Sequence, residues 1–365
     1  MSSNAPTDPP HPTPARAASP QAAIAVDLSV IIVSWNVWDL LRACLQSLAR
    51  LSSPLPGPTD VRGFGPDPDT DADTATFEVI VVDNASSDAT ADFLPAHFPW
   101  VRLIRNADNL GFTKANNLGY AASRGRFVYF LNPDTELLAE GPQGDSLWTL
   151  YRAVAEDPSI ALAGPQLRYG DGSLQSSRRR FPTRWTPFWE STWLGARWPG
   201  NPWSRRLHMA DRAPDYRQEV DWVVGAAMLA RRAALEVVRD HAYPGPFDEG
   251  FFMYSEELDL CRRLKNAGGR IVYVPEAVVI HHEGRSSEQV VAARHIHFNC
   301  AKIRDTARTF GPAWAALLRH YLLWEFRVQW LIEAAKWAVG HRRALRARRM
   351  AAYAQVLASG LRPPA

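Results

Sequence analysis

Carboxylate and imidazole side chains occur at four places where they could hold a divalent cation or accept a proton. Asp83 ends the run FEVIVVD, Asp134 follows FLNP, Glu256 and Glu257 stand in SEELD, and His281 follows VPEAVVI. Carboxylates are hard ligands that suit Mg²⁺ or Mn²⁺, and one with a tuned pKa can act as a general base. Ordinary turns explain the aspartates equally well, and a helix start explains the glutamates. The residue types alone leave both interpretations open.

The segments that carry these residues alternate between strand and helix patterns. Buried strands are predicted at 28–35, 77–83, 101–105 and 126–132, and helices at 37–51 and 110–124. This alternation predicts an α/β fold, a doubly wound, mostly parallel sheet flanked by helices. Ligands bind such sheets outside the carboxyl ends of the strands, which is where Asn36, Asp83 and Asp134 lie. That shared location favours a functional interpretation of these three residues.

Beyond Leu138 the pattern is weaker. It predicts a helix at 145–156, a strand at 160–168, a tryptophan- and loop-rich region at 171–218, a strand and helix at 220–238, a helix at 255–268, two short strands at 269–284 and helices through 288–360. We expect three parts: a disordered leader at 1–26, a principal domain at 27–287 and a C-terminal helical region at 288–365. The leader lacks the apolar segment of a secretory signal.

Residues 52–76 interrupt the alternation with a segment rich in Pro, Gly and Asp, which predicts a disordered surface insertion. Its acidic residues alternate as in a calcium-binding loop: Asp67, Asp69, Asp71 and Asp73. The glycine and the terminal glutamate of such a loop are missing. We therefore do not expect a calcium site there.

The composition is that of an ordinary globular protein, with 46% hydrophobic and 22% charged residues. A net charge of +3 is too small to indicate a nucleic-acid partner. Three cysteines do not form a disulfide framework, so a cytoplasmic location is expected. No uncharged apolar run is long enough to predict a membrane-spanning helix.

Eight motifs, in order and over residues 28–287, resemble the inverting family-2 glycosyltransferases of GT-A fold, and particularly their rhamnosyltransferase-like branch. They are SVIIVSWN, VIVVDNASSD, NADNLGFTKANNLGY, FLNPDTEL, RRRFPT, VVGAAMLARR, FDEGFFMYSEELDLCRRL and VPEAVVIHHEGRSS. The resemblance implies a GT-A fold, a nucleotide-diphosphate sugar donor, a divalent metal (Mg²⁺ or Mn²⁺) and a glycan or lipid-linked acceptor. For this branch we expect rhamnose from dTDP-rhamnose, transferred during cell-surface polysaccharide synthesis.

The resemblance also assigns the metal ligands and the base. Family members commonly hold the metal with Asp-x-Asp, and here Asn132 replaces the first carboxylate while Asp134 remains. His281 matches the histidine that can join the metal shell, and His282 matches a variable position. An acidic pair ahead of a helix supplies the base, so Glu257 is expected in that role, with Glu256 as the alternative.

Two further groups of residues follow from the same resemblance. The expected donor-binding residues are Asn36, Asp83, Asn84, Asn109, Gly111, Phe112, Asn116, Asn132 and Asp134. Gly111 would allow the backbone to approach the ligand closely. The expected residues of the donor–acceptor junction are Trp222, Gly225, Ala226, Asp259 and Arg262. Core packing is the competing explanation for Trp222, Gly225 and Ala226, and a structural role is the competing one for Asp259 and Arg262.

The C-terminal segment 312–349 combines a wide apolar face with a basic end. Its apolar residues are Trp314, Leu317, Leu318, Tyr321, Leu322, Trp324, Val328, Leu331 and Ile332, and its arginines include Arg342, Arg343, Arg346, Arg348 and Arg349. This pattern suits either peripheral contact with an anionic membrane or packing on the principal domain. Both explanations stay open at this point.

Other functions fit less well. A sugar nucleotidyltransferase would need a glycine-rich, basic loop after the first strand, and Ser34-Trp35-Asn36 offers none. Within the family, a UDP-hexose or galactofuranose donor is an alternative to rhamnose. A catalytically degenerate glycan-binding or scaffold protein is favoured only by Asn132, and the presence of Asp134, Glu257 and His281 opposes it.

Overall fold

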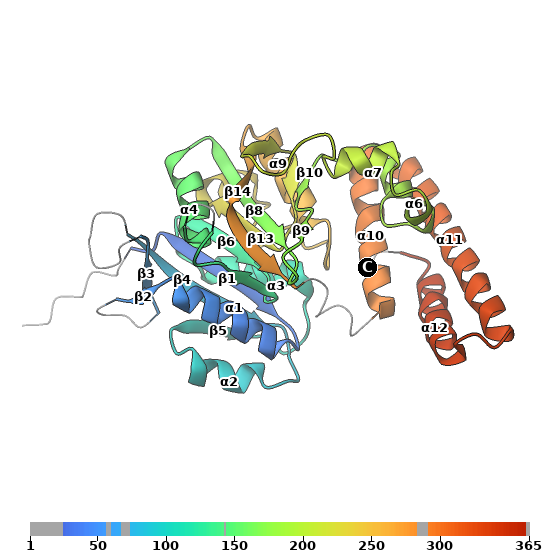
Figure 1. The fold of residues 1–365 in the computed structure, drawn as a ribbon, viewed down its shortest axis with the longest axis horizontal. Coiled ribbons are helices and arrows are strands. Elements are labelled where there is room, and N and C mark those ends of the chain that lie inside the picture. Colours follow the sequence, from blue (N-terminus) through green and yellow to red (C-terminus); the bar gives the residue numbers. More distant parts are fainter. Residues whose placement is uncertain (1–24, 56–59, 67–73, 142–143, 283–290, 363–365) are drawn as a thin grey trace, which may run out of the picture.

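The computed structural model describes residues 25–55, 60–66, 74–141, 144–282 and 291–362. Most of the expected leader and the alternating aspartates of the insertion lie outside these ranges. The chain forms one large twisted sheet flanked by helices, with three long helices standing to one side of it (Figure 1). The expected α/β architecture is confirmed.

Within the described residues the sheet has twelve strands, nine of which follow the order β11-β14-β8-β13-β6-β1-β4-β3-β2. β1 (Leu28–Ser34) runs parallel to both β4 (Ala75–Asp83) and β6 (Phe127–Leu131), and β5 (Val101–Arg105) runs parallel to β4. β13 (Ala227–Arg231) enters antiparallel between β6 and β8 (Ile160–Arg168). The carboxyl ends of β1, β4 and β6 therefore meet at one edge, as the sequence predicted.

Four more strands complete the side of the sheet that holds the candidate site. β14 (Arg270–His281) pairs with β8 in parallel, and its last residues pair with β7 (Thr135–Leu137) in antiparallel fashion. β11 (Gln218–Val220) covers the outer edge of β14. β9 (Leu174–Gln175) is an antiparallel addition to β8. β10 (Arg178–Arg179) and β12 (Trp222–Val223) form a separate two-stranded pair.

Each face of the sheet carries its own hydrophobic core because successive side chains of a strand point to opposite faces. One core contains Leu28, Val30 and Ile32 of β1 and is covered by α1 (Trp38–Arg50), α2 (Thr90–His97) and α4 (Ser146–Glu156). The other contains residues such as Ile31 and Phe130. It is covered by α3 (Gly111–Ala122), α8 (Arg232–Val238) and α9 (Glu256–Asn266).

Part of the predicted insertion is ordered at the edge of the sheet. β2 (Ser53–Pro54) and β3 (Arg62–Phe64) form an antiparallel pair that continues from β4. The side chain of Phe64 is fully buried and makes edge contacts with Phe77 and Tyr151. The expectation of a wholly disordered insertion is therefore wrong for these residues, because an aromatic anchor fixes them to the core.

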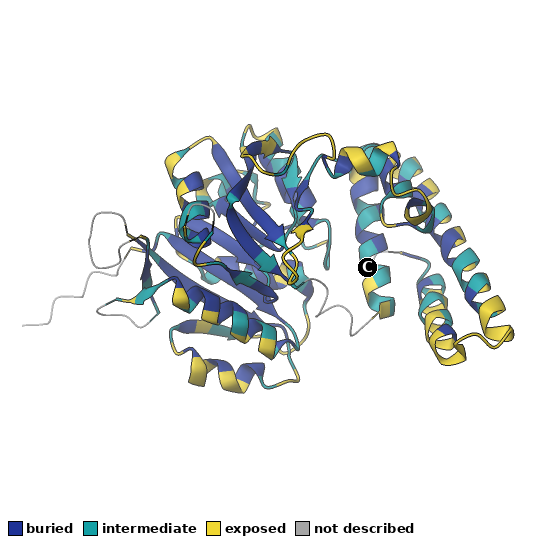
Figure 2. Cartoon of the chain, viewed as in Figure 1, coloured by how far each residue is buried: buried dark blue, intermediate teal, exposed yellow. Residues whose placement is uncertain are grey.

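The C-terminal region is a three-helix bundle of α10 (Val291–Phe310), α11 (Pro312–Ala338) and α12 (Arg343–Ser359) with its own core. The bundle packs on a segment of short helices, α5 (Thr186–Trp189), α6 (Trp193–Arg197) and α7 (Pro202–Leu207). Its outer side is largely exposed (Figure 2). Among the helices of the described ranges, none combines the length and the apolar character needed to span a bilayer.

Candidate active site

Asp134 and His281 are brought together by the pairing of β7 with β14. After β6 the chain turns at Asn132–Asp134 and re-enters the sheet as β7, where Thr135 pairs with His281. Nε2 of His281 lies 3.4 Å from Oδ1 of Asp134, and both side chains are buried. The neighbouring His282 is paired with Glu136 at 2.8 Å instead. The two expected metal ligands thus lie side by side.

Gln175 fixes the orientation of the His281 ring. Nδ1 of His281 lies 2.9 Å from Oε1 of Gln175 in β9. A carboxamide oxygen only accepts, so Nδ1 donates, and in the neutral imidazole Nε2 then presents its lone pair to Asp134. When two ligand atoms each lie about 2.1 Å from the same ion, the two atoms are roughly 3 Å from each other. The pair therefore has the chemistry and the spacing of two ligands that face one cation.

Asn132 adds an unsatisfied oxygen to this corner. Its side-chain Oδ1 is buried and has no hydrogen-bond partner among the residues that the structure describes, while its backbone amide donates to the carbonyl of Ala226 at 2.9 Å. A buried polar atom left without a partner costs about 1–3 kcal/mol, so a bound ligand would relieve it. Within the part of the chain that the structure describes, no group of three His, Cys, Asp or Glu side chains converges on a metal position. Asp134, His281 and the Asn132 oxygen fit a hard divalent ion that takes its remaining ligands from substrate or water.

The acidic pair lies at the first turn of α9, where Glu256 is buried and Glu257 is partly exposed. Burial raises the pKa of Glu256 well above its usual range, and the adjacent Glu257 carboxylate adds to the rise. Burial also raises the pKa of Glu257, although backbone amides of the helix start and of Gly225, together with Arg179, oppose the shift. Within the described ranges, one carboxyl oxygen of each glutamate has no hydrogen-bond partner. Glu257 is the member of the pair that faces Gly225 and Arg179.

Asp83 and Asn36 end two adjacent parallel strands and are joined through the loop that follows β4. Asp83 is buried, and its Oδ1 accepts the amide of Ser86 at 3.3 Å. Oδ1 of Asn36 accepts the amide of Ser87 at 2.7 Å, and its φ of 54° is a conformation that asparagine tolerates well. Both residues lie where the sequence placed them, and their contact with a nucleotide stays a prediction.

Asn84 and Asn109 brace the next loop. The amide group of Asn84 donates to Oδ1 of Asn109 at 2.9 Å and to the carbonyl of Gly111 at 3.1 Å, and its Oδ1 accepts from Asn106 and from the amide of Leu110. Their side chains are thus engaged with protein atoms. They shape the edge of the sheet by fixing its loops.

The backbone of Gly111 packs closely against Phe252. Its φ is +84°, and a Cβ at this position would lie 2.6 Å from both the carbonyl oxygen and the ring of Phe252. The amide of Phe112 donates to the same carbonyl at 2.8 Å, and Asn116 donates to the carbonyl of Phe112 at 3.0 Å. Glycine is required here because the segment before α9 packs onto the start of α3. Close approach of the Gly111 backbone to a ligand stays a prediction.

The expected junction residues divide into two groups. Trp222 donates through Nε1 to the carbonyl of Arg180 at 3.0 Å and lies beneath the guanidinium of Arg179, whereas Ala226 is core. Gly225 lies against Glu257, where a Cβ would make ordinary contacts at 3.5 Å. Asp259 and Arg262 are engaged elsewhere, because both pair with residues of α10. Trp222 and Gly225 thus remain beside the acidic pair, and the structural explanation fits Asp259 and Arg262.

Sequence reasoning missed the segment that connects the two halves of the site. Gln175 contacts His281, and four residues later Arg179 faces Glu257 and donates to Ser176 at 2.6 Å. The RRRFPT motif signalled that this stretch matters but assigned no role to any of its residues. Gln175 left no signal, since a glutamine in a polar segment is ordinary.

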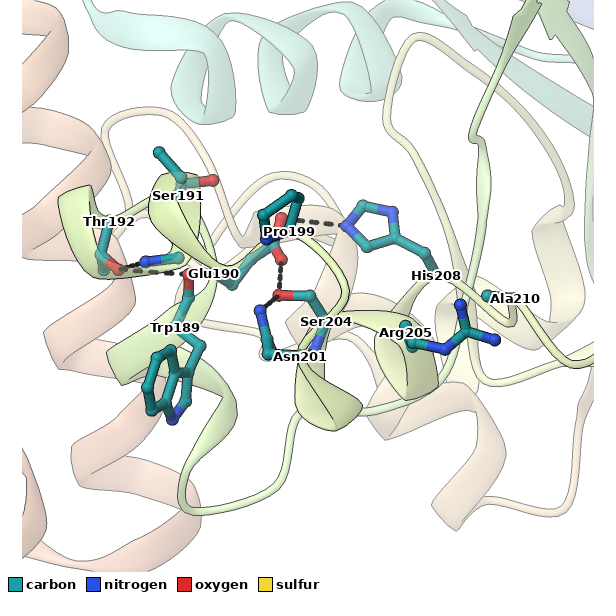
Figure 3. A pocket seen from close by; sticks show the side chains of 12 residues that line it. Trp189, Glu190, Ser191, Thr192, Pro199, Asn201, Ser204, Arg205, His208 and Ala210 are labelled. Carbon is teal, nitrogen blue, oxygen red and sulfur yellow. Dashed lines mark hydrogen bonds and ion pairs between the residues drawn. The ribbon is translucent and has the colours of Figure 1, made fainter.

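A pocket of about 520 Å³ lies beside α5, α6 and α7 (Figure 3). In its wall, Glu190 meets Nε2 of His208 at 3.0 Å and accepts the hydroxyl of Ser204 at 2.9 Å. Nδ1 of His208 lies 3.2 Å from Oγ of Ser176, the atom that also accepts from Arg179. None of the pocket-lining residues was predicted as a site residue. A polar chain nevertheless connects this pocket to the residue that faces Glu257.

Comparison with known proteins places the chain in a family. The family model described as "Glycosyl transferase family 2" matches residues 29–238, and "Glycosyltransferase like family 2" matches residues 194–295. The chain is 35% identical over 232 residues to the N-acetylglucosaminyl-diphospho-decaprenol L-rhamnosyltransferase of Mycobacterium tuberculosis, which covers 60% of this chain and 71% of that protein.

It is 30% identical over 226 residues to rhamnosyltransferase WbbL of Escherichia coli, covering 59% of this chain and 77% of the relative. Among solved structures, mannosyltransferase PcManGT from Pyrobaculum calidifontis, in complex with GDP-Man and Mn²⁺, is similar at 15% identity with a TM-score of 0.48. That alignment covers 93% of this chain and 87% of the other.

Proposed function

Because the chain belongs to glycosyltransferase family 2, we propose that it transfers rhamnose from dTDP-rhamnose to a glycan or lipid-linked acceptor during cell-surface polysaccharide synthesis. The choice of sugar is supported by two relatives named as rhamnosyltransferases, at 35% and 30% identity. The lipid-linked acceptor is supported by the printed name of the first. A UDP-hexose or galactofuranose donor is the alternative within the family.

The observation that carries the proposal is the pair of acceptor atoms on Asp134 and His281, which face each other at 3.4 Å. These two side chains would hold Mg²⁺ or Mn²⁺, with the unpartnered oxygen of Asn132 beside them. Such an ion, when bound, stabilises the negative charge of a diphosphate leaving group. Gln175 keeps the Nε2 lone pair of His281 directed at that position.

Glu257 is the proposed base of an inverting transfer. Its carboxylate would take the proton of the acceptor hydroxyl while that oxygen bonds to the anomeric carbon and the diphosphate departs with the electron pair. The raised pKa of Glu257 makes it a stronger base than an exposed glutamate, and Arg179 keeps the carboxylate form accessible. Glu256 is more deeply buried, so its carboxyl is best suited to stay protonated beside the working carboxylate.

The C-terminal bundle offers a surface for a membrane that carries the acceptor. Leu317, Trp324 and Leu331 follow one another at intervals of seven residues along α11, and each is about half exposed. The exposed arginines lie at the adjoining turn and on α12: Arg342, Arg343, Arg348 and Arg349. Leu318 and Leu322, from the same predicted apolar face, are buried in the bundle. The face thus divides between core and surface, and we propose that the exposed part contacts anionic lipid at the inner side of the cytoplasmic membrane.

The experiment that tests the reaction is a screen of nucleotide sugars. Purified protein with Mn²⁺ is offered dTDP-rhamnose, UDP-hexoses and UDP-galactofuranose together with a lipid-linked N-acetylglucosaminyl diphosphate, and the product is identified by mass spectrometry. The proposal expects a product one deoxyhexose heavier from dTDP-rhamnose. A product from a UDP-sugar alone would replace the donor, and no turnover of any donor would favour a binding or scaffold role.

A further inference from the structure

The turn that leads into α9 is held in a costly backbone conformation. Tyr254 and Ser255 are consecutive non-glycine residues with positive φ, at 72° and 64°. Each left-handed residue of this kind costs roughly 1–2 kcal/mol and persists only where its surroundings impose it. The side chain of Ser255 makes no capping hydrogen bond to the helix that it begins. The restraint on this turn must therefore come from outside α9.

Two aromatic contacts with α10 supply part of that restraint. The ring of Phe252 stacks on His297 at 4.2 Å between ring centroids, with an interplanar angle of 15°. Two residues later, the ring of Tyr254 meets the ring of Phe298 edge-on at 5.4 Å. Burial lowers the pKa of His297, which favours the neutral ring in this stack. Both contacts join the same turn of α10 to the segment before α9.

An ionic network joins α10 to the same region. Arg304 and Arg308 of α10 both bind Asp248, which lies ahead of the turn, and Arg308 also reaches Asp259 of α9 at 3.3 Å. Asp305 of α10 accepts from Arg262 of α9 at 3.1 Å. We call these six residues the α9–α10 clamp: Asp248, Asp259, Arg262, Arg304, Asp305 and Arg308. Because Asp248, Asp259 and Asp305 are largely buried, these pairs are less screened than surface pairs.

Arg304 also lies directly on the backbone of the segment. A Cβ built on Gly250 would come within 1.9 Å of its guanidinium, and the same group lies 5.1 Å from the ring centroid of Phe251. One side chain of α10 thus contacts Asp248, Gly250 and Phe251. The segment from Asp248 to Ser255 is enclosed by α10 on one side and by the start of α3 on the other.

We propose that α10 is a positioning element of the active site, whose clamp residues hold the first turn of α9 and so place the carboxylate of Glu257. This inference rests on the proposed role of Glu257 as the base. The clamp residues touch no reacting atom and act through α9. The C-terminal bundle is accordingly part of the catalytic unit, although the family-2 models together end at residue 295, near the start of α10.

The test replaces both clamp arginines of α10, in Arg304→Gln/Arg308→Gln, and measures sugar transfer across pH. Displacing a catalytic group by about 1 Å costs up to about a hundredfold, so kcat should fall between about tenfold and a hundredfold. The donor KM should stay within about threefold, since the loss lies in the chemical step. The acid limb of kcat should move to lower pH, because a looser α9 hydrates Glu257. The charged and titratable groups that face it are Arg179 of β10 and, on α9, Glu256 and Cys261.

Two comparisons separate positioning from general stability. Arg319→Gln removes an arginine of α11 that donates to the carbonyl of Gly360 at the end of α12, and it should leave kcat and its pH profile unchanged. Arg304→Lys/Arg308→Lys keeps the charges and should recover part of kcat. If the glutamine variant does not fold, two variants of His297 make the same comparison. His297→Ala removes the stack on Phe252, whereas His297→Phe keeps it.

Equal losses in the clamp and control variants, or a clamp variant with wild-type kcat, would overturn the inference. Glu257→Gln distinguishes this failure from failure of the proposed function. If Glu257→Gln is inactive while the clamp variant behaves like wild type, only the role of α10 is wrong. If Glu257→Gln retains full activity, the base itself has been misassigned.

Discussion

Nε2 of His281 faces Oδ1 of Asp134 at 3.4 Å, while Nδ1 of the same ring is held by Gln175 at 2.9 Å. These contacts join the end of β14 to the turn before β7, although the two are far apart in sequence. They also include Gln175, a residue that no motif identified. We therefore expect metal affinity to depend on all three residues. We expect Asn132 to be compatible with the proposed metal site, because its side-chain oxygen is buried at the same turn and has no hydrogen-bond partner among the described residues.

Removing the contact between Gln175 and His281 should weaken metal binding, although both proposed metal ligands remain. Gln175→Ala frees the His281 ring, and loss of such a partner typically weakens metal binding about 10- to 100-fold. Binding of Mn²⁺ in the presence of dTDP, followed by electron paramagnetic resonance, measures this directly. His281→Ala should remove more affinity, whereas His282→Ala, which breaks only the pair with Glu136, is the matched control. Equal effects of the two histidine substitutions would contradict the assignment.

The buried carboxyl of Glu256 should make stability depend on pH. Its pKa is raised in the folded state by burial and by Glu257, so the folded protein favours the protonated form. The stability that this preference gives is present below the unfolded pKa of about 4.3 and is lost as pH rises through the folded pKa. Glu256→Gln, which stays neutral, should therefore gain Tm relative to wild type as pH rises from about 4 to 8.

Differential scanning fluorimetry across this pH range measures the gain, with exposed Glu140→Gln as the control for loss of one carboxylate. If the Tm difference between Glu256→Gln and wild type does not grow with pH, Glu256 does not have a raised pKa in the folded protein.

The start of α3 should tolerate no side chain at Gly111. Gly111→Ala introduces both the cost of φ +84° and a 2.6 Å contact with the Phe252 carbonyl and ring. Gly172→Ala has nearly the same φ, +82°, with open space around it, so it isolates the backbone cost of about 1 kcal/mol. Urea denaturation should give a free-energy loss for Gly111→Ala larger than that for Gly172→Ala. Similar losses would mean that Phe252 moves aside easily.

The exposed face of α11 should bind anionic membranes. Trp324→Ser/Leu331→Ser removes two exposed apolar side chains and should abolish flotation with vesicles that contain phosphatidylglycerol. Binding should also fall as salt rises, because the arginines contribute through screened charge. Val237→Ser, which changes an exposed apolar residue of α8, is the control. Flotation of the double variant at the wild-type level would end the membrane proposal.

The sequence predicted those parts of the fold that depend on local pattern. Buried runs and amphipathic runs placed β1, β4, β6, α1 and α3, and the acidic and histidine motifs placed Asp134, His281 and Glu257 at element ends. Strand direction is not encoded in such patterns, so the antiparallel entry of β13 was not predicted. The partnership of Gln175 with His281 spans 106 residues, and only the assembled sheet brings them together.

The protein contacts of the side chains that brace the site were not foreseen for the same reason. Asn84, Asn109 and Gly111 fit a ligand pocket by resemblance, yet their immediate contacts are with one another and with Phe252. Asp259 and Arg262 suited an acceptor but are paired with α10. In each case a residue distant in the chain hydrogen-bonds to, packs on or pairs with the motif residue. Sequence reasoning had no means of placing that distant residue.

The most direct test of the central claim compares wild type with Glu257→Gln in transfer from dTDP-rhamnose under saturating Mn²⁺. We expect Glu257→Gln to bind Mn²⁺ and dTDP as wild type does, because the substitution leaves the Asp134–His281 pair unchanged. Its kcat should be about 10² to 10⁴ times lower, the usual contribution of a general base. Unchanged kcat with intact binding would contradict the assignment of Glu257 and, with it, the proposed mechanism.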